Sequence, residues 1–561
     1  MKADGVKFRD LLSGKPQYRV PLFQRTYSWQ EDQWQRLWDD ILEVYSMETM
    51  RSHFIGAIVT LPQPDAPERS TKFMLIDGQQ RMTTLFVILS VIRDAALGSD
   101  SSDLANEIND EYLFNKYAAI DTEREKMIPT RKDLVVFRAV TRGNRDGVDG
   151  QVAIARDFFS NVLKKGDLQG EEVSLSRLKD VITSYLDVVS IIVEQSDSPH
   201  KIFESLNHTG MSLSASDLIR NDIFMRIIDE REQEQAYSSK WFPMEQRLTR
   251  ENKQSALSDF FWRYLMKDGA LPRYDEVYEA MRDYIDSQTT SAPVTTVLDR
   301  LNYYSEFYAA IWRPDQHEES SSVKDRLMRL NQWEVDVAYP FLLEAMHQRA
   351  ESAVSEEEFC ELLKMIESYV VRRIICGVPT NRLRRIFGRM AEHTDTSDYL
   401  ASCRDYLMEN EWPSDKLFHE MFQTTRIYIP SRLSRTRLIL TSLEHSFEHH
   451  ESVDMSVTTI EHIMPQTLND DWRSELGDDY AEIHEKYLHT IGNLTYSGYN
   501  SELGNAKFSY KKNILSKSHY EMNRYVVERE DWTEEEIHAR GQHLADRALT
   551  IWKRDAYLNS I

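Results

Sequence analysis

The 561-residue sequence predicts an α+β multidomain protein that is mostly helical. The chain is several times longer than a typical domain of roughly 100–200 residues. Its first and last hundred residues mix strand and helix patterns, whereas the stretch from about 95 to 450 repeats apolar side chains at helical spacing. Hydrophobic residues make up 41% and charged residues 29%, which is typical of a folded globular protein. We therefore expect four parts: residues 1–100, 101–235, 236–440 and 441–561.

Composition excludes several classes of protein. No stretch reaches the roughly 18 uncharged apolar residues that cross a bilayer, and the first ten residues lack the apolar core of a secretory signal. The three cysteines, Cys360, Cys376 and Cys403, form no C-x-x-C pair, so neither a disulfide framework nor a thiolate zinc site is indicated. We expect a cytoplasmic protein with no membrane partner.

The net charge of −24 argues against a nucleic-acid enzyme, because phosphate contacts normally need a positive surface. However, binding depends on the local field. The stretch from Leu503 to Lys517 contains four lysines and no acidic residue. A local basic strip can therefore coexist with an acidic chain.

The N-terminal hundred residues predict two strands and a helix. Residues 54–60 and 73–78 are short apolar runs, as in buried strands, and residues 28–45 have helical spacing. Ser28 and Glu31 have the spacing of a capping box at the start of this helix. Its apolar face carries Trp34, Leu37, Trp38 and Ile41.

The second strand leads through Asp77 and Gly78 into an apolar helix. A helix that starts at a glycine turn presents free backbone N–H groups and its positive dipole end, where phosphate binds. Arg81 in the first turn could add a bidentate contact. The chain has no Walker P-loop, so any nucleotide hydrolysis must use a different cradle.

Helical runs fill the middle of the chain, and the pattern changes again near the C-terminus. Residues 458–465 resemble a strand, and residues 489–508 predict a strand, a turn and a second strand. A last helix follows Thr533 and Glu536, which have capping-box spacing. Its apolar stripe contains Ile537, Leu544, Ala548 and Ile551.

Glu461 and His462 lie side by side at the end of the strand-like run, and Pro465 blocks continuation as a helix. Phosphodiester hydrolysis needs a base near neutrality and a divalent ion that stabilises developing charge. His462 could be the base and Glu461 could hold the ion. Because the following segment is rich in asparagine, whose amide oxygens are hard ligands, Mg²⁺ or Mn²⁺ is favoured over zinc.

This pattern resembles the His-Me finger (HNH-like) nuclease domain at the C-terminus of the GmrSD-type restriction family, which has a ββα-metal fold. The matching positions are His462, Pro465, Gly492, Asn493, Leu494, Thr495, Asn500, Asn505 and Lys511. The resemblance implies that His462 is the catalytic base and that Glu461 and Asn500 bind the metal. It also implies that Asn493 braces the catalytic hairpin.

Other positions of the motif have two interpretations. Asn505, Lys507 and Lys511 could contact DNA phosphate; alternatively Asn505 caps a helix and the two lysines lie on a solvated face. His489, just before the glycine, is first assigned a structural role.

Residues 20–29, 77–81 and 203–210, with Leu213, Asp217 and Asn221, resemble the N-terminal domain of the same family. That domain has a ParB-like, sulfiredoxin-related fold, and the resemblance implies binding and hydrolysis of a nucleoside triphosphate (GTP, ATP or CTP) and sensing of modified DNA. The implied nucleotide-binding residues are Asp77, Gly78, Gln80, Arg81, Glu204 and Asn207. The implied DNA-binding or pocket-lining residues are Gln24, Arg25, Tyr27 and Trp29. Trp29 could instead belong to the core, and Asp217 and Asn221 could simply stabilise a helix.

Together the two motif sets predict a type IV-like antiphage endonuclease that cuts modified phage DNA under nucleotide control. The ParB-like domain would occupy residues 1–100, with 101–235 as a helical extension that completes its site. A helical body (236–440) and the nuclease domain (441–561) would follow. A homodimer would make cutting of both strands easier. Two alternatives remain: a nucleotide-switched DNA-binding protein with an inactive nuclease fold, and a toxin nuclease that acts on RNA or on the host's own DNA.

Overall fold

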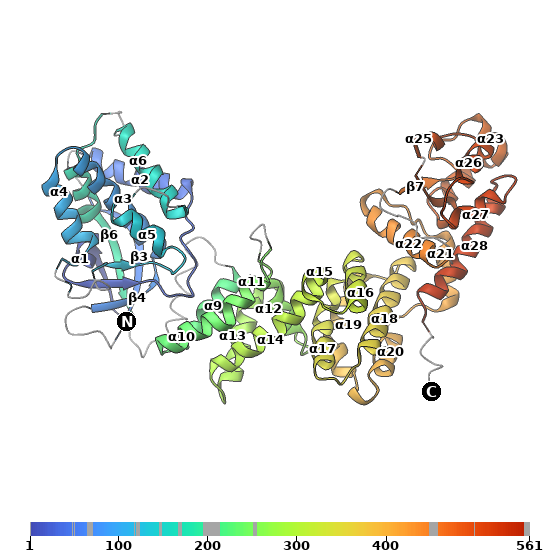
Figure 1. Ribbon diagram of the computed structural model, residues 1–561, viewed down its shortest axis with the longest axis horizontal. Helices are drawn as coiled ribbons and strands as arrows, with labels where there is room; N and C mark the ends of the chain where they lie inside the picture. Colours follow the sequence, from blue (N-terminus) through green and yellow to red (C-terminus); the bar gives the residue numbers. More distant parts are fainter. Residues whose placement is uncertain are drawn as a thin grey trace. The chain divides into compact units, whose positions relative to one another are not determined.

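The computed structural model forms two compact units (Figure 1). The first comprises Met1–Pro243 and Tyr278–Asp299, and the second comprises Met244–Val277 and Arg300–Ile561. The residues that the structure describes are 2–47, 49, 51–63, 71–116, 118, 124–144, 149–166, 171–193, 214–250, 255–447, 458–498 and 500–554. No helix in these ranges combines the length and the apolar run that a bilayer crossing requires.

The first unit is built on a mixed six-stranded sheet. Its strands are β1 (Lys2–Lys7), β2 (Pro16–Arg19), β3 (His53–Pro62), β4 (Thr71–Asp77), β5 (Met127–Ile128) and β6 (Leu186–Ile192), in the order β1-β6-β3-β4-β2-β5. The pairs β1–β6 and β3–β4 are antiparallel, and the other three pairs are parallel. β3 and β4 confirm the two strands predicted from the sequence.

Strand β6 lies in the stretch that was predicted to be helical, and the prediction is wrong there. Five of the seven residues of this strand are apolar, and the strand directly follows the short π-helix η3 (Val181–Tyr185). A short continuous apolar run cannot be distinguished from a buried helix segment by periodicity alone. The sheet therefore needs residues from both of the first two predicted parts.

Alternation along β3 and β4 places helices against both faces of the sheet. Ile58 and Leu75 belong to the larger core, together with side chains of α2 (Glu31–Ser46), α3 (Gln79–Gly98), α6 (Gln151–Lys165) and α7 (Leu175–Asp180). Their neighbours Val59 and Ile76 form a second cluster, against which Leu218 of α9 (Ala215–Met225) packs. The turn between β4 and α3 thus leads from the sheet into a helix of the larger core.

Helix α2 has the predicted apolar face, with Trp34, Leu37, Trp38 and Ile41 all buried. The predicted capping box is wrong, because the helix begins at Glu31 and the Gln33 side chain accepts the Gln30 N–H (2.8 Å). The Ser28 N–H instead donates to Gln80 Oε1 (2.8 Å). Ser28 therefore lies before the helix and uses its backbone N–H to bind the first turn of α3.

Short helices complete the first unit. These are α1 (Phe8–Leu12), α4 (Ser102–Glu107), η1 (Ile108–Leu113), α5 (Leu134–Thr141), α10 (Glu230–Ala236), η4 (Tyr237–Trp241) and most of α13 (Val277–Thr289).

The second unit is helical up to residue 447, which confirms the helical spacing predicted for this stretch. Its longer helices here are α12 (Leu257–Met266), α16 (Ser321–Gln332), α17 (Tyr339–Ala350), α18 (Glu356–Ile375), α19 (Leu383–Met390), α20 (Tyr399–Glu409), α21 (Asp415–Thr424) and α22 (Leu433–His445). Helix α14 (Val294–Trp312) runs from the first unit into the second.

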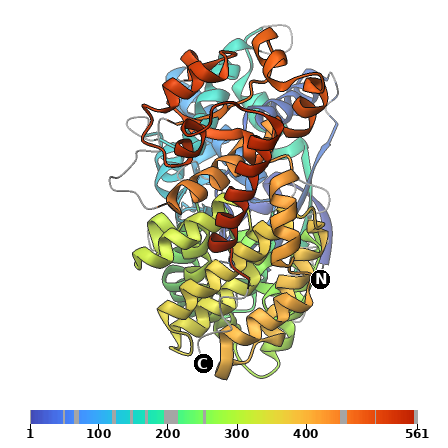
Figure 2. The same cartoon turned by 90° about the vertical axis from the view of Figure 1, so that its right-hand side faces the viewer.

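The C-terminal part of this unit carries a two-stranded antiparallel sheet, β7 (Thr459–His462) and β8 (Leu494–Ser497). The other elements are α23 (Asp470–Leu476), α24 (Tyr480–Tyr487), η11 (Ile491–Asn493), α25 (Asn500–Leu503), α26 (Phe508–Leu515), α27 (Met522–Val527) and α28 (Glu534–Ile551). The second strand predicted after the turn is wrong, since α25 occupies that place. Helix α28 begins after Thr533, as predicted, and packs along α21 (Figure 2).

Candidate functional site

The β7–β8 pair brings the two halves of the C-terminal motif together. His462 is the register partner of Leu494, and Glu461 is the partner of Thr495. The Ile463 N–H then donates to the carbonyl of Asn493 (3.0 Å). Two segments far apart in the sequence therefore form one small hairpin-like platform.

His462 is nearly buried, with 4% of its surface exposed. Its Nε2 lies 3.2 Å from Nδ1 of His489, and its Nδ1 lies 3.5 Å from Nε2 of the exposed Gln466. The ring of Tyr428 meets the imidazole edge-on with a centroid distance of 4.6 Å. Burial lowers the pKa of His462 to about 3, with smaller contributions from the charges of His489 and Lys511. The imidazole is therefore neutral at neutral pH.

Glu461 points to the opposite face of β7, as alternation along a strand requires. Its carboxylate accepts from Lys511 Nζ at 2.7 Å, and the same ammonium donates to the His462 carbonyl at 2.8 Å. Burial raises the pKa of Glu461 and lowers that of Lys511, while the ion pair opposes both shifts. The Lys511 side chain is fully buried, so the predicted phosphate contact of Lys511 is wrong: the residue joins α26 to β7.

Asn493 is fully buried and uses its side-chain amide entirely within the chain. Its Oδ1 accepts from the Met464 N–H (2.7 Å) and from Trp532 Nε1 (3.3 Å). Its Nδ2 donates to the carbonyls of Met464 and Leu488, both at 3.0 Å. These bonds hold the turn after His462 in place. The Asn493 side chain therefore braces the hairpin and does not point to a substrate.

Sequence analysis missed Arg540, a second brace of the same turn. Its guanidinium is fully buried on α28 and donates to the carbonyls of Gly492 and Leu494, both at 2.8 Å. A Cβ on Gly492 would lie 2.2 Å from the Ile537 carbonyl oxygen. Only glycine at position 492 allows α28 to pack this closely. In the sequence, the available signal for Arg540 was an arginine within a helix that carries an apolar stripe.

The remaining residues of the motif lie towards the surface or outside the described residues. Asn500 begins α25, but its side chain lies outside the part that the structure describes. Asn505 is exposed, and its carbonyl accepts from Asn469 Nδ2 (2.8 Å). Lys507 is exposed directly before α26. Phosphate contact by Asn505 and Lys507 stays a prediction.

The predicted magnesium or manganese site, one carboxylate with amide oxygens, stays a prediction, because the side chain of Asn500 lies outside the described residues. Within them, no group of three His, Cys, Asp or Glu side chains is arranged to hold a metal ion. The predicted ligand Glu461 is already paired with Lys511 and lies on the other face of β7 from His462. A hard cation beside His462 would need oxygen donors from elsewhere.

The N-terminal candidate site lies where β4 passes into α3. Gly78 has φ +92°, and a Cβ there would lie 3.1 Å from the Ala57 carbonyl oxygen, so both conformation and space favour glycine. Among the residues that the structure describes, no side chain caps the start of the 20-residue helix α3. The positive dipole end at such a helix start favours an anion.

Two arginines flank this helix start. Arg81 donates from Nη1 to the Ala57 carbonyl (2.7 Å), and its guanidinium lies over Gly56 in β3. Arg25 is half-buried, and burial lowers its pKa, although the nearby carboxylates of Asp217 and Asp77 oppose the shift. Phosphate binding by Arg25 and Arg81 stays a prediction.

Other predicted residues of this region support the architecture. Gln24 is buried and donates to the carbonyls of Leu75 and Ile76 (2.9 and 2.7 Å). Gln80 is buried and accepts the Ser28 N–H. Tyr27 is 5% exposed, and its hydroxyl is bound to Thr84 and Trp34, so its side chain belongs to the core rather than to a DNA-binding surface.

Trp29 is partly buried against the larger core, as in the alternative interpretation. Asp217 forms a capping box with Ser214 and pairs with Arg220 (2.7 Å), which is a helix-stabilising role. Asn221 is buried on the same helix. Glu204 and Asn207 lie outside the described residues.

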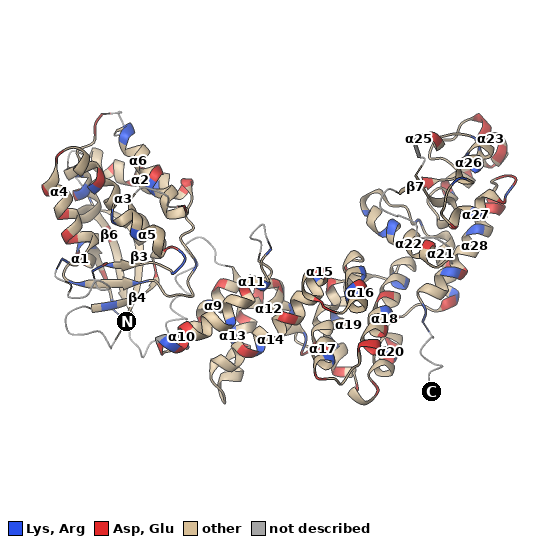
Figure 3. Cartoon of the chain, in the orientation of Figure 1, with Lys and Arg blue, Asp and Glu red and all other residues tan. Residues whose placement is uncertain are grey.

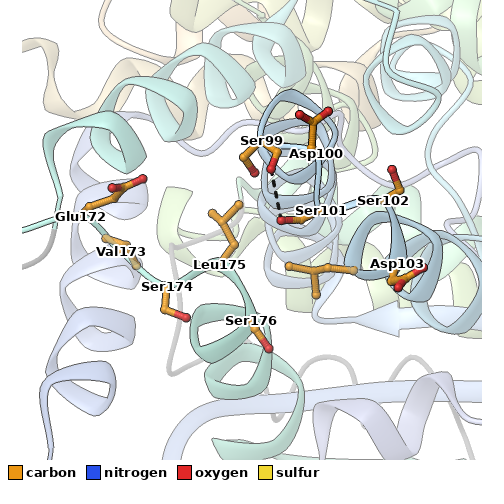
Figure 4. Close-up of a pocket in the computed structure, with 11 residues that line it drawn as sticks. Ser99, Asp100, Ser101, Ser102, Asp103, Glu172, Val173, Ser174, Leu175 and Ser176 are labelled. Carbon is orange, nitrogen blue, oxygen red and sulfur yellow. Dashed lines mark hydrogen bonds between the residues drawn. The ribbon is translucent and has the colours of Figure 1, made fainter.

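A pocket in the first unit lies away from these residues. It is lined by residues 99–104, which follow α3 and include the start of α4, and by residues 172–176 before and in α7 (Figure 4). Its lining includes Asp100, Asp103 and Glu172. These carboxylates would repel a phosphate, so the pocket does not fit a nucleotide.

Two family comparisons match parts of the chain. Residues 8–224 match the N-terminal domain of the GmrSD restriction endonuclease, and residues 412–547 match the C-terminal domain of GmrSD restriction endonucleases. The first match contains the β4–α3 turn, and the second contains the β7–β8 pair. No curated protein matches the chain. Because the two matches together span more than half of the sequence, the chain belongs to the GmrSD restriction endonuclease family.

Proposed function

We propose that the chain is a modification-dependent DNA endonuclease of antiphage defence, with His462 as its general base and a nucleoside triphosphate bound at the start of α3 as its regulator. Membership in the family supports the coarser part, a type IV restriction endonuclease that acts on DNA. The observation that carries the proposal is the neutral His462, held at the junction of the two motif halves.

His462 would accept the proton of the attacking water while the water oxygen forms a bond to phosphorus and the P–O bond of the leaving group breaks. Of its two nitrogens, Nδ1 has the longer contact, and its partner Gln466 is exposed. We therefore assign Nδ1 to the substrate side and Nε2 to the contact with His489. A phosphate anion beside the ring would raise the pKa of His462 and strengthen it as a base.

A requirement for Mg²⁺ or Mn²⁺ belongs to the proposal, but no step is assigned to the ion because the described donors do not form its site. Chelation with EDTA, followed by addition of either ion, tests the requirement directly. The nucleotide phosphates would lie at the uncapped start of α3, near Arg81 and Arg25.

The decisive experiment incubates the full-length protein with modified and unmodified phage DNA, divalent cations and GTP, ATP or CTP. We expect cleavage of modified DNA, lost in His462→Ala and retained in His519→Ala. His519 is an exposed histidine of the same unit and serves as the matched control. Intact DNA under every condition with the wild-type protein contradicts the proposal.

A second candidate is a nucleotide-switched DNA-binding protein whose nuclease fold is inactive. The nearly complete burial of His462 and the occupied carboxylate of Glu461 favour it. Phage-protection assays distinguish the two functions. If protection persists in His462→Ala and is lost in Arg81→Ala, the function is binding rather than cleavage.

A further inference from the structure

A second basic segment runs from the end of α21 through most of α22. Residues 421–443 contain four arginines and no acidic residue, in a chain with a net charge of −24. Figure 3 shows blue residues in the stretch beside α22. The lysine segment 503–517, by contrast, loses Lys511 to the interior.

This arginine segment contacts the candidate catalytic residues directly. The N–H groups of Ile427 and Tyr428 both donate to the carbonyl of His489, at 2.9 and 3.2 Å. The ring of Tyr428 stacks on His489 and meets His462 edge-on. Arg426 is therefore the chain neighbour of residues bound to the His462–His489 pair.

The platform also fixes the other end of the segment. The Tyr496 hydroxyl of β8 donates to the Arg437 carbonyl (2.8 Å), and Arg437 Nη1 donates to the Thr458 carbonyl (3.0 Å). The Thr436 hydroxyl closes the loop on the Ile427 carbonyl (2.7 Å). The backbone between residues 426 and 437 is thus held against the β7–β8 pair.

The arginines of this segment differ in what they already bind. Arg435 pairs with Glu334 (2.9 Å), and Arg437 holds the start of β7. Arg426 and Arg432 are exposed, and within the described ranges neither guanidinium has a hydrogen-bond or carboxylate partner. Two cations of the segment that contacts His462 and His489 are therefore available to a ligand.

We propose that Arg426 and Arg432 form a phosphate-binding strip that holds the DNA backbone beside the linkage cleaved at His462. This inference rests on the proposed endonuclease function and adds the residues that bind its substrate. A guanidinium binds phosphate with paired N–H donors. Such contacts are independent of base sequence and release counterions, so they appear in the salt dependence of binding.

Helix α19 offers a matched control. Its Arg385 and Arg389 are also exposed, in a stretch (368–391) that likewise contains no acidic residue. This helix packs on α17 and its neighbouring short helices. The pair therefore matches the charge and exposure of the strip outside the β7–β8 platform.

The experiment measures binding of an unmodified 30-base-pair DNA duplex by fluorescence anisotropy at about 50–200 mM salt. Three full-length proteins are compared: His462→Ala alone, and His462→Ala combined with either Arg426→Ala/Arg432→Ala or Arg385→Ala/Arg389→Ala. We expect the slope of log K against log salt to fall in magnitude by about 2 in the strip variant and to stay unchanged in the α19 variant, because each lost phosphate contact removes about 0.9.

An unchanged slope in the strip variant, or an equal fall in the α19 variant, overturns the inference. So does a fall seen only with an RNA duplex and not with DNA. Thermal unfolding of each protein shows that the fold is retained. Cleavage by the wild-type protein separates the two failures: if it cuts DNA while the strip variant binds normally, only the strip is wrong. If it neither binds nor cuts, the proposed function fails as well.

Discussion

At the scale of single residues, His462 makes a specific pH prediction. Burial lowers the pKa of its imidazole to about 3, so the neutral form required of a base persists on acidification. A histidine with the ordinary pKa of 6.5 would have half of its imidazole protonated at pH 6.5. We expect single-turnover kcat/KM, which reports the free enzyme, to show no loss centred there between about pH 8 and pH 5.

The His519→Ala variant provides the control for this profile and should behave like the wild-type protein. An acid-side loss centred near pH 6.5 in both proteins would show that the base is another group, or that His462 is exposed in the active form.

Gly56 offers a residue-scale test of the N-terminal site. It has φ +113°, and an added Cβ would lie 2.8 Å from Cζ of Arg81, so Gly56→Ala must displace that guanidinium. Loss of one charge-assisted hydrogen bond costs about 1.5–3 kcal/mol, so we expect about tenfold or weaker binding of a fluorescent nucleoside triphosphate. Gly5→Ala is the control, since its Cβ would meet no atom within 4 Å. Equal affinity in the two variants contradicts the assignment of Arg81.

At the scale of elements, the ion pair between β7 and α26 distinguishes a structural Glu461 from a metal ligand. Both side chains are buried, so Lys511→Met leaves an uncompensated carboxylate and should cost about 3–5 kcal/mol of stability. The double variant Glu461→Gln/Lys511→Met removes both charges and should recover most of that loss. Denaturant unfolding measures the two stabilities.

Cleavage by the double variant then decides the role of Glu461. If the carboxylate only holds Lys511, the refolded double variant keeps cutting DNA. A stable double variant without cleavage would instead support the predicted metal role, with the ion displacing Lys511 in the active form.

The elements also show what could be predicted from the sequence. Strands β3 and β4 were predicted from their apolar runs. The start of α3 was predicted because the second run ends at Gly78, where the turn requires a backbone conformation that favours glycine. Strand β6 was missed because a short, mainly apolar stretch between helices is hard to distinguish from a buried helix segment. Alternation along β7 could have separated Glu461 from His462, but the partner of Glu461, Lys511, lies 50 residues away. Charge patterns do not show which lysine is buried. They also do not show that the arginine segment is held against the β7–β8 pair, which is why this segment was overlooked.

At the scale of the whole molecule, the charge distribution reconciles an acidic chain with a DNA substrate. A net charge of −24 would repel a polyanion approaching at random. The stretches 368–391 and 421–443, however, contain arginine and no acid, and the second is fixed against His462. The repulsion is screened beyond about 10 Å at 0.1 M salt, so local cations decide where DNA binds.

Regulation must also operate at this scale, because the nucleotide and the DNA are proposed to bind in different units. If nucleotide at α3 changes the affinity for DNA by some factor, DNA must change the affinity for nucleotide by the same factor. Typical couplings are about 5–150-fold. We expect both factors, measured on the non-cleaving His462→Ala protein, to agree, and Arg81→Ala to abolish them. Arg9→Ala, an exposed arginine of the first unit, should leave both intact. Factors of one in both directions would show that the two sites act independently, and nucleotide control of cleavage would then have to arise in the rate of the chemical step rather than in binding.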